Sequence, residues 1–139
     1  MISDQTALKD IRELWQGVET LRGRVQRTLL GSFANGGHSV ILIADIAHNL
    51  PFIHACAVLN DVLEQLAKQK RFDCKSRFLG SLLDASRDKL HWDDFAIVRD
   101  AADERNRVAH EGHVVSRADC WKYIDAIRKE FMAWGILVA

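Results

Sequence analysis

The chain has 139 residues, with 19 basic and 19 acidic side chains and three cysteines. This length predicts one domain with its own core, and the balanced charge excludes a general attraction to nucleic acid, so any such contact must be local. Three separated cysteines without a Cys-x-x-Cys pair predict neither a disulfide framework nor a zinc site. The N-terminus has no signal-peptide pattern and no apolar run is long enough to cross a bilayer, so we expect one cytoplasmic domain over residues 1–139.

Apolar residues recur three or four positions apart through the N-terminal half, which is typical of amphipathic helices. They predict a first helix from about Asp4 to Leu30 and a loop from Gly31 to Gly37. The segment 39–50 reads as a helix or as a short buried strand, with the helix favoured. Pro51 suits the first turn of a further helix that ends near Lys70, because proline has no N–H to satisfy there.

The C-terminal half predicts three more helices. Residues 76–89 carry an apolar stripe consisting of Phe78, Leu79, Leu82 and Leu83. Asp93 is the expected N-cap of the next helix, which Gly112 stops, and Ser116 with Asp119 resembles a capping box that opens the last helix. The fold expected is therefore all-α, an antiparallel bundle of four to five helices.

Arg105 breaks the apolar side of the fourth predicted helix. At about 100° per residue it projects near the centre of one apolar arc, formed by Phe95, Ile97, Val98, Ala101, Ala102, Val108 and Ala109. A buried guanidinium without a partner costs several kcal/mol. We therefore expect it to pair with a carboxylate, to extend its charged end out to solvent, or to face an interface that binds an anion. The carboxylates that could pair with it are those of Glu13, Asp45, Asp61 and Glu64.

His110 follows Arg105 by five residues, so on an unbroken helix the two side chains diverge by roughly 140°. If the helix ends near Ala109, ahead of the stop at Gly112, His110 lies on the outgoing loop and can swing back beside Arg105.

The run Arg105-Asn106-x-x-Ala109-His110, before the last helix of a small bundle, resembles the HEPN superfamily. The upstream Trp92-x-x-Phe95 and the Ser116 cap are also similar to that family. The resemblance implies a HEPN-like helical domain that acts as a metal-independent endoribonuclease, in a toxin or defence effector. It also implies a homodimer, an RNA substrate and an antitoxin protein as partners.

In RNA the 2′-hydroxyl is an internal nucleophile, so cleavage needs a base, an acid for the leaving 5′-oxygen and a cation for the phosphate. His110 can exchange protons near neutral pH, and Arg105 offers a bidentate fork to phosphate oxygens. Asn106 is expected to orient His110 or the substrate. A twofold dimer would bring two such sets into one cleft. HEPN toxins paired with nucleotidyltransferase antitoxins carry a tyrosine two residues after the histidine; here that position is Gly112, so nucleotidylation is not expected there.

Several alternatives stay open at this stage. Arg107 and His113 form a second pair with one more intervening residue. A HEPN-like module without catalysis could bind a nucleotide, a nucleic acid or a protein, with Arg105 as an anion contact.

No cofactor and no metal site are predicted. Basic residues that could contact RNA phosphates are Arg22, Arg24, Arg27, Lys68, Lys70 and Arg71, with Lys75 and Arg77 beside them.

Overall fold

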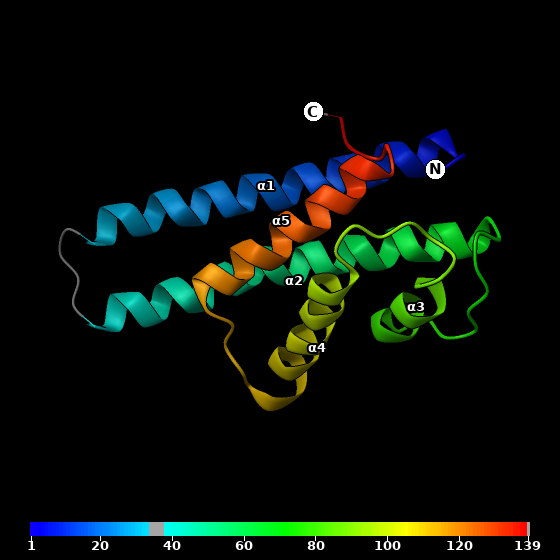
Figure 1. The fold of residues 1–139 in the computed structure, drawn as a ribbon. Helices are drawn as coiled ribbons and strands as arrows, with labels where there is room; N and C mark the ends of the chain where they lie inside the picture. Colours follow the sequence, from blue (N-terminus) through cyan, green and yellow to red (C-terminus); the bar gives the residue numbers. More distant parts are fainter. Residues whose placement is uncertain (34–37, 139) are drawn as a thin grey trace.

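In the computed structural model, two long helices, α1 (Gln5–Phe33) and α2 (His38–Lys68), lie antiparallel and side by side (Figure 1). The structure describes the backbone of residues 1–33 and 38–138 and the side chains of residues 1–27 and 45–138. Three shorter helices follow: α3 (Leu79–Ser86), α4 (Phe95–Glu111) and α5 (Arg117–Ala133). Across these described ranges there is no strand, so the predicted all-α bundle is confirmed. None of their helices has the length and hydropathy that a membrane span needs.

Helix α2 is the central element of the bundle because it packs against each of the other four helices. Its inward residues Phe52, Leu59, Leu63 and Leu66 are completely buried. Opposite them, α1 contributes Trp15, whose ring meets Phe131 of α5 edge to face at 5.2 Å. Edge-to-face pairs of this kind are favoured by the ring quadrupoles.

The beginning of α1 agrees with the sequence, but its end does not. Asp4 caps the helix, because its Oδ1 accepts the N–H groups of Thr6 and Ala7 at 2.9 and 3.1 Å. The helix continues to Phe33, so the first part of the loop predicted from Gly31 is helical. The rest of that loop, residues 34–37, lies outside the described residues.

The break predicted at Pro51 is wrong, since α2 runs through it and contains residues 39–50 as helix. Proline removes one i to i−4 hydrogen bond, which ordinarily costs about 3 kcal/mol inside a helix. Here Pro51 is buried and its helix packs against α1 along the bundle. Tertiary burial therefore outweighs the local penalty, as it often does for helix propensity.

Helix α3 is shorter than its apolar pattern predicted. It begins at Leu79 and ends at Ser86 instead of covering residues 76–89, although Leu79, Leu82 and Leu83 are buried as expected. Phe78 is the N-cap residue in extended conformation, and its side chain is 80% exposed. The prediction that Phe78 lies within this helix was therefore wrong, because the chain turns into the helix only after this residue.

The N-terminus of α4 is capped from another helix and not by the predicted Asp93. The N-cap residue is Asp94, whose own side chain makes no capping bond. Instead, the buried carboxylate of Glu130 on α5 accepts the N–H groups of Asp93 at 3.0 Å and Asp94 at 2.7 Å. The bond from Asp94 satisfies a donor that a helix start leaves unpaired, and the bond from Asp93 ties the preceding residue to the same carboxyl group.

The chain beyond α4 is fastened to α2 by the buried side chain of Asn49. Its Nδ2 donates to the Val115 carbonyl at 2.8 Å and to the Asp45 carbonyl at 2.6 Å, and its Oδ1 accepts the Val115 N–H at 3.0 Å. The next helix then starts as predicted, because the Ser116 hydroxyl accepts the Asp119 N–H at 3.2 Å.

We expect Asn49→Ala to lower the free energy of unfolding by roughly 2–4 kcal/mol, because the N–H and C=O of buried Val115 would each lose a partner at about 1–3 kcal/mol. Urea unfolding followed by circular dichroism measures this. Asn60→Ala is the matched control, since within the described residues the Asn60 side-chain amide donates only to the carboxylate of Glu64, one turn along the same helix. Equal midpoints for the two variants would contradict the role of Asn49.

Candidate functional site

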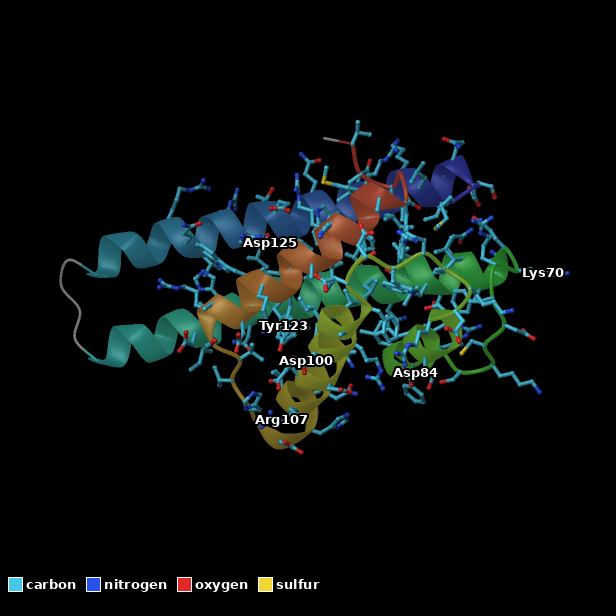
Figure 2. All side chains as sticks on the ribbon, viewed as in Figure 1. Lys70, Asp84, Asp100, Arg107, Tyr123 and Asp125 are labelled. Carbon is cyan, nitrogen blue, oxygen red and sulfur yellow. The ribbon has the colours of Figure 1, made fainter. Side chains whose placement is uncertain are left out.

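Helix α4 leaves the bundle at an angle, and its C-terminal half extends away from the other helices (Figure 1). Near its middle it is joined to α5, where the Tyr123 hydroxyl donates to Asp100 at 2.7 Å. Figure 2 shows these two residues facing each other, with Arg107 further out near the outer end of α4. The candidate residues 105–113 therefore lie on an arm that the bundle holds at its base.

Arg105 continues the buried stripe of α4 beyond the core. Val98, Ala101 and Ala102 are buried, whereas Arg105 is half-buried and Ala109 is exposed. Arg105 lines a cavity of about 250 Å³ between α2, the start of α3 and α4. It forms no ion pair or hydrogen bond with any side chain in the described ranges, so none of the four carboxylates considered from the sequence is its partner.

The predicted approach of His110 to Arg105 within one chain is not found. Helix α4 continues to Glu111, and Gly112 then ends it in the left-handed conformation with φ 63°. His110 is thus still helical and exposed, roughly 140° around the helix from Arg105. Asn106 lies one turn before His110 on the same exposed side, so these two side chains can act together.

The alternative pair, Arg107 and His113, is already engaged in a local ion-pair network. Arg107 contacts Glu104 at 3.0 Å and Glu111 at 3.4 Å. His113 Nε2 lies 2.7 Å from the other carboxylate oxygen of Glu104. These contacts hold the turn after α4 against its last two helical turns. They give Arg107 and His113 a structural role that Arg105, Asn106 and His110 do not share.

The basic residues proposed as RNA contacts fall in different places. Arg22 is paired with Asp125 at 2.7 Å and lies over the Trp121 ring at 5.0 Å. Arg24 and Arg27 are exposed on α1. Lys70 and Arg71 line a cavity at the far end of α2, whereas Lys68 and Lys75 line one that adjoins the cavity of Arg105. The structure therefore brings only part of this set near the candidate site.

The sequence did not predict that Arg77 and Phe78 lie near Arg105. Arg77 and Phe78, 28 and 27 residues earlier, line the same cavity. The basic character of residues 68–77 was visible in the sequence, but the register that brings this segment to α4 was not. The nearby Cys56 thiol stays neutral, because burial raises its pKa to about 12 while the charge of Arg105 acts in the opposite direction.

Comparisons with protein-family models, with curated proteins and with solved structures found no match. Among the described residues, no cluster of three or more histidine, cysteine or acidic side chains could hold a metal ion.

We expect Asn106→Ala and His110→Ala to change the free energy of unfolding by no more than ~0.5 kcal/mol, because both side chains are exposed and make no described contact. Glu104→Ala should lower the midpoint of thermal unfolding measurably, because it removes the carboxylate shared by Arg107 and His113. Differential scanning calorimetry compares the three. A clear loss of stability in His110→Ala would assign that residue a structural role.

Proposed function

We propose that this chain is a HEPN-like, metal-independent endoribonuclease that acts as a homodimer, with Arg105, Asn106 and His110 in its active site. It would serve as a toxin or defence effector restrained by an antitoxin protein. The observation that carries the proposal is the division of roles on α4. Glu104 and Glu111 bind Arg107 and His113, while the three residues of the HEPN-like motif make no such contact.

The reaction assigns one task to each side chain. One His110 removes the proton of the 2′-hydroxyl, whose oxygen attacks the adjacent phosphorus. A second His110 gives a proton to the leaving 5′-oxygen. Arg105 neutralises the charge that develops on the phosphate oxygens, and Asn106 orients the neighbouring imidazole. The products are a 2′,3′-cyclic phosphate and a 5′-hydroxyl, so no external reactant is needed.

The dimer is required because one chain offers only one His110, and it points away from Arg105. A surface for it is an exposed apolar strip on α2, which we call the α2 strip and define as Ile46, Leu50, Ile53 and Ala57. Its members share one side of the helix, and Leu50 and Ile46 are 58% and 50% exposed. One end of the strip reaches α4, because Ala57 lines the same cavity as Arg105.

A second candidate is a HEPN-like module that binds an anionic ligand without cleaving it. The divergence of Arg105 and His110 within one chain favours this function, as does the position of Arg105 beside Arg77. The two candidates differ in what they require of His110. Cleavage depends on its imidazole, whereas anion binding through Arg105 does not.

We expect purified protein to cleave single-stranded RNA in excess EDTA and to leave 2′,3′-cyclic phosphate ends. His110→Ala should lower the rate by about 10²–10⁴-fold, and Arg105→Ala by about 10²–10³-fold. Gel electrophoresis of end-labelled RNA measures both.

The matched controls are His113→Ala and Arg107→Ala, which replace the same residue types nearby and should stay within a few-fold of the wild-type rate. Full activity in His110→Ala would rule out the assignment. RNA that is bound but never cleaved would support the binding module instead.

We expect Leu50→Glu to weaken dimerisation at least ~100-fold, because an unpaired carboxylate buried in an interface costs several kcal/mol. Cleavage should fall with it at concentrations where the protein is monomeric. Sedimentation equilibrium gives the dissociation constant. Leu14→Glu is the control, since Leu14 is an exposed leucine on another helix, α1. A dimer unaffected by Leu50→Glu would exclude the strip as its interface.

A further inference from the structure

The cavity beside Arg105 has the components of a binding subsite for single-stranded nucleic acid. Its walls come from three separate segments: Arg105 from α4, Arg77 and Phe78 from the turn before α3, and Cys56 with Ala57 from α2. At about 250 Å³ it is smaller than the ~300–1,000 Å³ of sites for drug-sized ligands. It therefore suits one group of a polymer better than a whole free ligand.

Phe78 is unusual among the large apolar side chains, because a ring that is 80% exposed lies on a well-fixed backbone. Its N–H donates to the Ser76 hydroxyl at 3.2 Å, and its carbonyl accepts the Leu82 N–H at 3.0 Å, inside the first turn of α3. The ring is thus presented to solvent at the cavity, and no ring contact joins it to another of the described side chains. A fixed, exposed aromatic ring is what a stacked base requires, since every base has a π-face.

The charges around this ring favour a phosphate backbone. Arg77 and Arg105 both line the cavity, and neither forms an ion pair with any described carboxylate. Two buried residues of the lining add no negative charge at neutral pH, because the Cys56 thiol remains protonated and Leu79 is apolar. Asp61 is the one carboxylate in the cavity lining, and two guanidinium groups outweigh it.

A second cavity, of about 650 Å³, continues from the first and shares Asp61 and Arg77 with it. Lys68 and Lys75 line this part, together with Glu64. Along the two cavities four basic side chains face two carboxylates, in a chain whose total charge is zero. This local excess favours a path for a nucleic-acid strand that joins Arg105, Phe78 and the two lysines, Lys75 and Lys68.

We propose that these cavities form a subsite for single-stranded RNA, in which Phe78 stacks on one base and Arg77 and Arg105 bind the phosphates that flank it. The inference rests on the proposed function in taking RNA as the substrate. The inference adds that the turn before α3 holds the nucleotides on either side of the cleaved RNA bond. Because stacking tolerates any base, the subsite selects single strands over duplexes and not a particular sequence.

The test measures binding without cleavage, with a fluorescein-labelled, non-cleavable 2′-O-methyl oligonucleotide and the wild-type protein. We expect Phe78→Ala and Phe78→Leu to raise the dissociation constant about 10-fold, and Phe78→Tyr to retain wild-type affinity. Arg77→Ala should raise it as well and reduce the slope of log K against log salt by about one. A 2-aminopurine base in the oligonucleotide should be quenched by the wild type and by Phe78→Tyr, but not by Phe78→Leu.

Arg71→Ala is the matched control, because Arg71 is an exposed arginine of the same segment that lines a different cavity. Wild-type affinity and quenching in Phe78→Leu would overturn the subsite, and so would dissociation of the dimer by Phe78→Leu, which would make Phe78 a protein contact. Cleavage assays separate this from the proposed function. If RNA is cut normally but Phe78 and Arg77 have no effect, the subsite alone is wrong. If both residues affect binding but nothing is cut, the ribonuclease proposal is wrong.

Discussion

The position of α4 depends on two buried polar side chains, Glu130 and Asn49, because the fully buried residues of the helix, Val98, Ala101 and Ala102, all lie in its first half. Glu130 reaches from α5 and satisfies the two N–H groups at the start of α4. Asn49 reaches from α2 and binds both backbone groups of Val115 after α4 has ended. Buried polar groups of this kind are costly unless they are fully paired. Their pairing fixes both ends of an arm that would otherwise have few contacts to orient it.

The last turns of α4 divide neighbouring charged residues into two sets with different tasks. Arg107 and His113 share Glu104, and this local network stabilises the turn around Gly112. Arg105 is directed to the other side, towards α2, where the cavity offers it a second guanidinium and no paired carboxylate. Arg105 and Arg107 look equivalent in the sequence, but only the charge of Arg107 is neutralised by described carboxylates. An unneutralised, half-buried cation is costly to maintain and is suited to binding an anion.

The proposed RNA subsite and the proposed dimer interface use neighbouring parts of the surface formed by α2, α4 and the turn before α3. Phe78 and Arg77 come from one chain and would hold a strand against the side of α4 that carries Arg105. The α2 strip would lie next to the bound RNA strand and would bind the second subunit, which supplies its own His110. In the proposed dimer, general acid and base would be supplied by separate copies of His110, and substrate binding by residues within each copy. Arg105 and His110 would then not need to meet inside a single subunit.

The sequence by itself determined the all-α class, the Ser116 cap, the stop at Gly112 and most inward residues, because these depend on periodicity and on chemistry within one or two turns. It also singled out Arg105 as an exception on an apolar stripe. Only the tertiary structure decided that α2 continues through Pro51, that Glu130 caps α4 in place of Asp93, and that Phe78 is exposed. It also decided that Arg77 and Phe78 adjoin Arg105. These outcomes depend on contacts between residues far apart in the chain. The burial that such contacts produce outweighs local propensity, and short-range sequence patterns carry no information about them.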